Sequence, residues 1–436
     1  MYNKKGKLPV LAAAAVIILA LITGCSKSPS GGSSGAAASS AGSGGSAPIN
    51  ISIWHYFEHE AEALNKLAED FNKLHTAENV HLTATYMARE ELMNQYTIGA
   101  VSGQLPDIGM VDSPDHASYI ALGVFEDITD ELKAWGELDQ FYPGPLSSTM
   151  DANGRIYGLP NNSNCLALAC NMDLLNAAGI AKPTTWAEFE AACAKLTDPA
   201  EARYGFAMSA ISNEEGTFQF IPWLYSAGGS VARLDSPGSI RAMEFLAGLI
   251  QKGYMSKEVV NWGQGDAMNA FIAGKAAMVE SGTWQIASDI IPKIGDSFKV
   301  EYTLLPKDEK YASVIGGENF GVCTGTKYRE LCIEFLKYME TADNVAYWCE
   351  IAGKLPVRLD SSKLRDFWTT DPYFAVFTEG MNYAVARGPH PEWPTVSRAL
   401  YTAGQTVLLG EKSPADAMKA AAATLAPVFE KTPIAQ

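Results

Sequence analysis

Residues 49–73, INISIWHYFEHEAEALNKLAEDFNK, begin as a strand pattern and continue as a helix pattern. Ile49, Ile51 and Ile53 alternate with polar residues on one face, and from Ala61 to Leu74 apolar residues recur at helical spacing. Further strands at 80–86 and 106–112 flank a second helix over 90–103. This strand–helix–strand–helix–strand order predicts a largely parallel α/β sheet with right-handed crossovers.

Ligands of parallel sheets bind beyond the carboxyl ends of the strands. In this chain those ends are 54–58 and 112–115, which are rich in aromatic and acidic residues. We therefore expect a binding site where these two segments meet.

The same stretch contains an H-x-x-E-H sequence, His55 to His59, which is a signature of some zinc peptidases. Zinc would require both imidazoles on one helix face. His55 directly follows the strand, and the apolar stripe of the helix begins only near Ala61. We therefore expect no metal site here, and His59 becomes a candidate for ligand contact at the rim.

The N-terminus has the pattern of an export signal. Three lysines precede an uncharged apolar run over 8–22, which is followed by Thr23-Gly24-Cys25. Residues 21–25, LITGC, resemble the lipobox of bacterial lipoproteins, which implies removal of 1–24 and lipidation of Cys25. In 26–48, 20 of 23 residues are Gly, Ser or Ala, which predicts a flexible linker over 25–48.

The remaining residues, 49–436, are too many for one ordinary core, which suggests two lobes. Without 1–24 the chain would carry 30 basic and 49 acidic side chains, a balance that disfavours nucleic acid as a partner. Six cysteines remain besides Cys25, and none forms a C-x-x-C pair. Each lies in an apolar segment, so buried free thiols are expected, although an even number in an exported chain permits disulfides.

Later segments continue the α/β pattern. We expect a buried strand at 165–170, a helix at 184–198 with a capping start at Thr184 or Thr185, and a helix that stops at Gly228-Gly229. From Tyr328 onward periodicity predicts mostly helix.

Taken together, several segments resemble the family 1 extracellular solute-binding proteins of bacterial ABC importers, a group that includes the maltose-binding protein. The matching pieces include LPDIGMVDSPDHASYIALGVFEDIT, NGRIYGLPNNSNCLALACNMDLLNAAGI, AMNAFIAGKAAMVESGTW, YTLLPKDEKYASVIGGENFGV and AGKLPVR. They run in family order through nearly all of 49–430.

This resemblance implies a type II periplasmic-binding-protein-like fold with a ligand cleft between two lobes. The first lobe would comprise 49–159 plus 308–357, and the second 160–307 plus 358–430. Such a protein is not an enzyme and uses no cofactor or metal. It would act as a monomer, held by a lipid on the extracellular face of the cell membrane, and deliver a carbohydrate to the importer's membrane subunits by closing over it.

A sugar presents flat C–H faces and hydroxyls, so aromatic planes and planar polar groups are the candidate contacts. At the strand ends these are Trp54, Tyr56, Glu58, His59 and Asp112. The resemblance adds a crossing segment, a second-lobe helix, an aromatic shelf, a Gly-Gly loop expected near the cleft, and two later positions. They are Asn162, Asn164, Phe218, Gln219, Trp284, Gly317, Glu318, Arg358 and Trp393.

For several candidates a purely structural role stays open. Trp54 and Trp393 could pack a core or a loop, Asp112 could cap a helix, the asparagines could form turns, and Arg358 could make an ion pair. Two functional alternatives also stay open. One is a secreted glycoside-acting enzyme that uses paired carboxylates such as Glu58 and Asp112. The other is a binding protein for a non-sugar solute.

Overall fold

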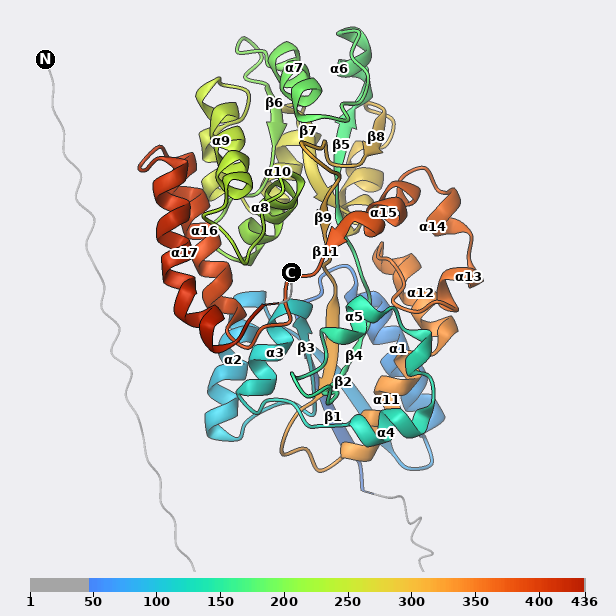
Figure 1. Cartoon of the computed structure of the whole chain (residues 1–436). Coiled ribbons are helices and arrows are strands. Elements are labelled where there is room, and N and C mark those ends of the chain that lie inside the picture. Colours follow the sequence, from blue (N-terminus) through green and yellow to red (C-terminus); the bar gives the residue numbers. More distant parts are fainter. Residues whose placement is uncertain (1–46, 435–436) are drawn as a thin grey trace, which may run out of the picture. The chain divides into compact units, whose positions relative to one another are not determined.

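The computed structural model describes residues 47–434, and the proposed signal, Cys25 and most of the linker lie outside this range. Two separate sheets organise the described residues, and helices cover both (Figure 1). One sheet has the order β2-β1-β3-β10-β4, the other β6-β7-β5-β8, and a two-stranded pair, β11-β9, stands apart from them.

The first sheet is built from β1 (Ile49–His55), β2 (Val80–Tyr86), β3 (Ile108–Asp112), β4 (Leu159–Pro160) and β10 (Glu318–Val322). β1 runs parallel to both β2 and β3, which confirms the parallel arrangement expected for the N-terminal strands. β10 is antiparallel to β3, with Glu318 opposite Asp112. Two predicted contact residues are therefore neighbours: Asp112 at the C-terminal end of β3 and Glu318 at the N-terminal end of β10.

Hydrophobic packing covers both faces of this sheet because its strands carry apolar residues on each side. Ile51 and Ile53 face one cluster, and Trp54 packs on the other beside Tyr96. The associated helices are α1 (Ala61–Leu74), α2 (Arg89–Ser102), α3 (His116–Ala121), α4 (Thr129–Trp135), α5 (Pro143–Ser147), α11 (Arg329–Met339) and α12 (Ala342–Ala352), with the 3₁₀ turns η1 (Ser113–Asp115) and η2 (Leu138–Gln140).

The second sheet consists of β5 (Leu166–Asn171), β6 (Tyr204–Ala207), β7 (Ala276–Gly282) and β8 (Val300–Thr303). β6 is parallel to β7, whereas β5 is antiparallel to both of its neighbours. Around it lie α6 (Met172–Ala177), α7 (Trp186–Leu196), α8 (Glu214–Ser226), α9 (Pro237–Gln251), α10 (Gln264–Ile272), η3 (Lys257–Asn261) and the π-helix η4 (Ile286–Ile294). α7 begins with the expected capping box, formed by Thr185 and Glu188.

Three chain segments run between the two sheets and pair with one another. Asn164 and Gly316 exchange backbone hydrogen bonds at 3.0 and 2.9 Å, and Ile315 donates to Val385 at 2.8 Å. Ile315 directly follows β9 (Ser313–Val314), and Val385 is the last residue of β11 (Ala384–Val385), which pairs with β9. Helices α13 (Ser361–Leu364), α14 (Phe367–Thr370) and α15 (Phe374–Gly380) and η5 (Met381–Tyr383) lead to β11.

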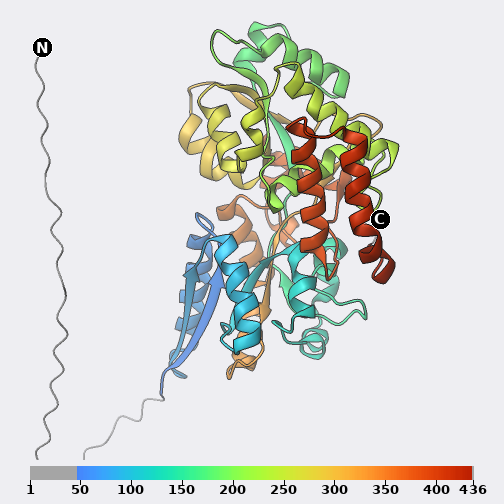
Figure 2. The ribbon, with the colours of Figure 1, turned by 90° about the vertical axis from the view of Figure 1, so that its left-hand side faces the viewer.

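The predicted helical C-terminal third is confirmed, and its last two helices are α16 (Trp393–Leu408) and α17 (Pro414–Lys431). α16 packs on α8 and α9 and also touches η1 and α3, so it contacts elements of both sheets (Figure 2). α13 packs on α12, which means that the chain beyond 358 stays beside the first sheet before it reaches the second. The residue boundaries of the lobes therefore stay a prediction.

The six described cysteines are free and buried, as expected from their apolar surroundings. Among residues 47–434, no helix combines the length and apolar character needed to cross a membrane.

Candidate functional site

A cavity of about 910 Å³ lies between the ends of the two sheets. Its walls come from the loop after β1, the ends of β3 and β10, the N-terminus of α8, the start of α10 and the turn after β7. The aromatic residues of the lining are Tyr56, Phe57, Tyr86, Phe218 and Trp284. Its charged and histidine side chains are Glu58, His59, Glu60, Arg89, Asp112, Glu214, Glu215, Asp289, Lys293, Glu318, Lys354 and Arg387.

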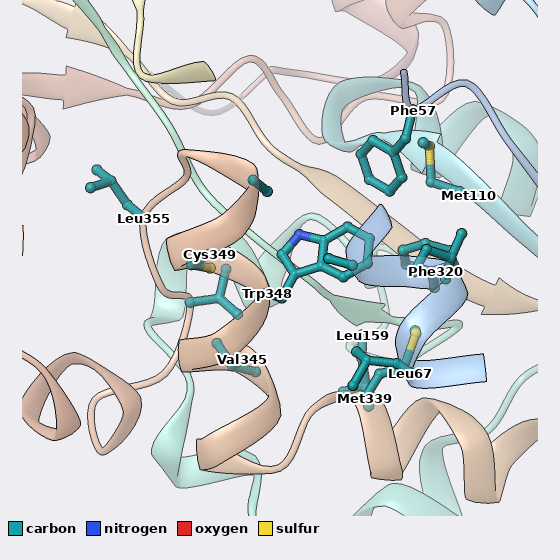
Figure 3. Close-up of a cluster of buried hydrophobic side chains, with 14 of the residues drawn as sticks. Phe57, Leu67, Met110, Leu159, Phe320, Met339, Val345, Trp348, Cys349 and Leu355 are labelled. Carbon is teal, nitrogen blue, oxygen red and sulfur yellow. The ribbon is translucent and has the colours of Figure 1, made fainter. Parts of the chain in front are cut away.

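Phe57 anchors the loop after β1. Its ring is buried 5.1 Å from that of Trp348 and 6.1 Å from that of Phe320, within the core that Figure 3 shows. Neighbouring residues of the loop line the cavity, and Tyr56 donates a long hydrogen bond of 3.5 Å to Glu318 Oε1. Burial, followed by the charge of Glu318, raises the pKa of Tyr56, so Tyr56 stays a neutral hydroxyl.

The positions of His55 and His59 at this loop also test the geometry that a zinc site of the H-x-x-E-H type requires. β1 ends at His55 and α1 begins at Ala61, so the two histidines share no helix face, as the sequence predicts. His59 lies 3.2 Å from Glu60 and 3.3 Å from the carbonyl of Ala352. No cluster of three or more potential metal-ligating side chains occurs within 47–434.

One wall of the cavity holds a buried network of charges. Arg387 donates to Asp112 at 2.7 and 3.0 Å and to Glu214 at 2.7 Å, and its guanidinium lies 4.4 Å from the Phe218 ring centroid. Arg89 donates to Asp115 at 2.7 Å and to Asp112 at 3.4 Å. Burial alone would lower the pKa of Arg387, but Asp112 and Glu214 outweigh it and raise that pKa. The network joins β3, a strand of the first sheet, to α8, a helix beside the second sheet.

Lys354 brings a second buried charge into the cavity. Its Nζ atom lies 3.5 Å from Glu60 Oε1, 3.7 Å from Glu318 Oε2 and 4.9 Å from the centroid of the Trp284 ring. Burial would lower the pKa of Lys354, but Glu318 and Glu60 raise it, so the amine is an ammonium ion. Burial raises the pKa of Glu318 although Lys354 opposes this. The 3.7 Å separation of Lys354 Nζ and Glu318 Oε2 favours a pair in which both groups are charged. Because burial raises the pKa of Glu318, its ionisation costs more free energy than that of an exposed carboxyl group.

Three buried acceptors of the lining lack a hydrogen-bond donor among the described residues. They are Asn164 Oδ1, Gln285 Oε1 and Glu318 Oε2, the last of which lies 3.7 Å from the Lys354 ammonium, beyond hydrogen-bond distance. A buried acceptor without a donor costs roughly 1–3 kcal/mol, so such atoms are expected to receive hydrogen bonds from water or a ligand. Hydroxyl groups are suitable donors for all three.

Nine of the fourteen predicted contact residues line this cavity. They are Tyr56, Glu58, His59, Asp112, Asn164, Phe218, Trp284, Gly317 and Glu318. Asp112 does not cap the following 3₁₀ turn with its side chain, because both of its oxygens accept from arginine. Phe218 and Gln219 lie one turn inside α8, which begins at Glu214. Glu318 belongs to strand β10 rather than to the expected loop.

The other five predicted residues lie outside the lining of this cavity, and each contacts neighbouring residues. Trp54 packs beside Tyr96 on the opposite face of its strand from Ile53. The remaining four are held by neighbours: Asn162 by Asn161, Gln219 by Ser209 and the carbonyl of Glu280, Arg358 by Asp360 and Glu137, and Trp393 by Glu214 Oε2. Trp393 thus supports a residue of the lining without reaching the cavity.

Sequence reasoning missed the cations of the cavity and their acidic partners, notably Glu60, Arg89, Glu214, Lys354 and Arg387. Glu60 lies inside the opening stretch 49–73 and Lys354 inside AGKLPVR, but nothing in their spacing sets them apart. Arg387 comes from a segment without periodicity, so only the folded chain shows where it lies.

Two sheets linked by three crossing segments, with a polar and aromatic cavity between their ends, define a two-lobed binding protein. The model of the bacterial extracellular solute-binding proteins matches residues 66–376. The chain belongs to this family.

Similar proteins agree with this assignment. A putative binding protein of Brucella abortus (strain 2308) is 24% identical over 83% of this chain and 90% of its own length. Among solved structures, an ABC transporter solute-binding protein from Thermotoga lettingae bound with α-D-tagatose is 26% identical, with a TM-score of 0.79 over 87% of this chain and 100% of its own. Maltose-bound MalE3 of T. maritima is 25% identical, with a TM-score of 0.77 over 86% and 99%.

Proposed function

We propose that this protein captures a carbohydrate in the cavity between its two sheets and delivers it to an ABC importer. The observation that carries the proposal is the presence, in one cavity, of aromatic rings and of buried acceptor atoms that receive no hydrogen bond from the described residues. Trp284, Phe218 and Tyr56 offer faces for C–H surfaces, while Asn164, Gln285 and Glu318 offer oxygens to hydroxyls. The tagatose-bound and maltose-bound relatives support the same ligand class.

The proposed action is binding without chemistry. Closure of the two lobes around the sugar would shift the population towards a loaded form, which the membrane subunits of the importer recognise. The chain would do this as a monomer. Its first lobe would comprise 49–159 plus 308–357, and its second lobe 160–307 plus 358–430. No cofactor or metal is needed for this action.

A thermal-shift screen against mono-, di- and oligosaccharides tests the proposal. A ligand present at about 100 times its dissociation constant adds roughly 2.7 kcal/mol of stability, which raises the melting temperature measurably. Isothermal titration then gives the stoichiometry, which should be one sugar per chain. If amino acids or metals shift melting and sugars do not, the carbohydrate assignment is wrong, and turnover of any sugar would favour the glycoside-acting alternative.

We further propose that a diacylglyceryl group on Cys25 tethers the protein to the outer face of the cell membrane. The lipobox-like LITGC and the Gly/Ser/Ala linker support this proposal. In cells, Cys25→Ser should move the protein from the membrane fraction to the soluble fraction. Ser26→Cys in the same background controls for the presence of a nearby thiol, and retention of Cys25→Ser in the membrane would contradict the anchor.

A further inference from the structure

The side chain of Lys354 lies in a part of the cavity wall whose neighbours are suited to bind a cation. Two carboxylates, Glu60 and Glu318, lie on it at 3.5 and 3.7 Å, and the Trp284 ring lies 4.9 Å away. Carboxylates combined with an aromatic face are the chemistry that proteins use to bind ligand ammonium groups. The side chain of Lys354 is only 5% exposed.

Two glycines fix the geometry of this receptor. A Cβ on Gly282 would fall over three adjacent atoms of the six-membered ring of Trp284, so the backbone of Gly282 packs against one face of the indole. The ammonium group of Lys354 lies 4.9 Å from the centroid of the same ring. Gly353 has φ +65°, and a Cβ there would meet the carbonyl of Thr283 at 3.2 Å. The backbone beside Lys354 thus presses directly on the turn that carries Trp284.

The other cations of the cavity are also engaged by carboxylates. Arg387 pairs with Asp112 and Glu214, Arg89 with Asp115, and Lys293 with Asp289. Within the described part of the chain, the lining therefore presents no cation without an acidic partner to a ligand. An anionic ligand would have to break one of these pairs, and a ligand ammonium group that enters the niche beside Glu60 and Glu318 would have to displace Lys354.

We propose that Lys354 is a specificity-determining residue, whose ammonium group fills the niche formed by Glu60, Glu318 and Trp284 and so excludes the ammonium group of an amino sugar from this niche. This inference rests on the proposed carbohydrate function and narrows its ligand class. A protonated amino sugar is rejected because its ammonium group meets the ammonium of Lys354 where it would otherwise meet two carboxylates and a ring.

The test compares a disaccharide of glucosamine with its di-N-acetylated form at pH 6, where the free amines are protonated, by isothermal titration. The wild-type protein should bind the amine form at least tenfold more weakly than the acetylated form or not at all. Lys354→Met keeps the stem and removes the charge, and it should bind the amine form at least tenfold more tightly than wild type. Adding Glu318→Gln to this variant should abolish the gain.

Two controls accompany these variants. Lys354→Arg keeps the positive charge and should behave as wild type, and Lys182→Met removes a lysine that pairs with Glu301 outside the cavity and should leave discrimination unchanged. Lys354→Gln replaces Lys354→Met if melting shows that the latter is unfolded. Equal affinity of wild type and the neutralised variant for the amine sugar overturns the proposal. Failure of every neutral sugar to bind wild type counts against the carbohydrate function, while the amine arm still decides the role of Lys354.

Discussion

Arg387 forms a bidentate ion pair with Asp112, with N–O distances of 2.7 and 3.0 Å. The same guanidinium donates to Glu214 at the start of α8, so it connects the two sheets at the wall of the cavity. All three side chains are buried. The stability of the fold and the geometry of the cavity therefore depend on the same group.

Arg387→Met should lower the free energy of unfolding by about 3–5 kcal/mol, because it leaves the buried carboxylate of Glu214 without a cation and that of Asp112 with only the 3.4 Å contact to Arg89. Urea denaturation of the ligand-free protein measures this loss. Arg241→Met is the control, since Arg241 pairs with Asp308 and Glu309 at the surface and its loss should cost clearly less. Equal losses in the two variants would contradict a structural role for the Arg387 network.

The same network should also limit the relative motion of the two sheets. Spin labels at Val101, on α2, and at Lys252, after α9, report the distance between helices that cover different sheets, and both positions are exposed. In the folded Arg387→Met variant the distance distribution should broaden relative to wild type without ligand. A distribution of unchanged width would show that Arg387 does not couple the two sheets.

Trp284→Ala should weaken sugar binding by about 2–4 kcal/mol while the protein stays folded, because a stacking face is lost from the cavity. Isothermal titration measures the affinity, and Trp284→Phe, which keeps an aromatic face, should lose less. Trp262→Phe serves as a control outside the cavity lining. If Trp284→Ala binds as tightly as wild type, Trp284 makes no contact with the ligand.

Gly282→Ala should weaken sugar binding without touching the ligand, because the new methyl group would displace the indole of Trp284. Gly265→Ala is a matched control, since Gly265 also lines the cavity and a Cβ there would meet nothing within 4 Å. As Gly265 lies in α10, its replacement by Ala should hold or slightly raise the melting temperature. Similar affinities of the two variants would mean that the position of Trp284 does not matter.

Glu340 should make stability depend on pH. Burial raises the pKa of its carboxyl to about 8, although Asn161 donates a hydrogen bond of 3.1 Å to Oε1. Because the folded state holds this proton more tightly than the unfolded state, the contribution is greatest at low pH. It is lost at up to about 1.4 kcal/mol per pH unit as pH rises from about 5 to 8. Glu340→Gln should be correspondingly less sensitive in urea titrations at pH 5, 6.5 and 8, and identical pH profiles would exclude the effect.

The N-terminal half of the first sheet follows from local sequence patterns. Period-two alternation in 49–54 and 80–86 and the amphipathic stripe from Ala61 to Leu74 specify elements that tertiary contacts then preserve. The pairing of β10 with β3 has no comparable local signal. The five residues of β10, ENFGV, follow two glycines and have the sequence of a loop. Only their pairing with Asp112 and Val111 of β3 identifies them as a strand.

The site divides in the same way. Tyr56, Glu58 and Asp112 were predictable because parallel strands end at one edge of a sheet, which brings their loops together. The positions of Lys354 and Arg387 in the cavity could not be predicted, because both residues are far along the chain from the N-terminal strands. Their acidic partners become neighbours only when the chain folds. A single buried Lys or Arg produces no periodic pattern in the sequence. Its pairing with carboxylates can therefore be recognised only in the folded structure.

The partnership of β3 and β10 also sets the order in which this protein can fold. Tyr56 and Glu318 meet across 262 residues, so the first sheet, although it starts the chain, stays incomplete until most of the polypeptide exists. Until then β3 has an open edge that any extended segment could join, a hazard for aggregation. Such long-range closure slows folding. The binding cavity therefore cannot form until segments that are far apart in the sequence have come together.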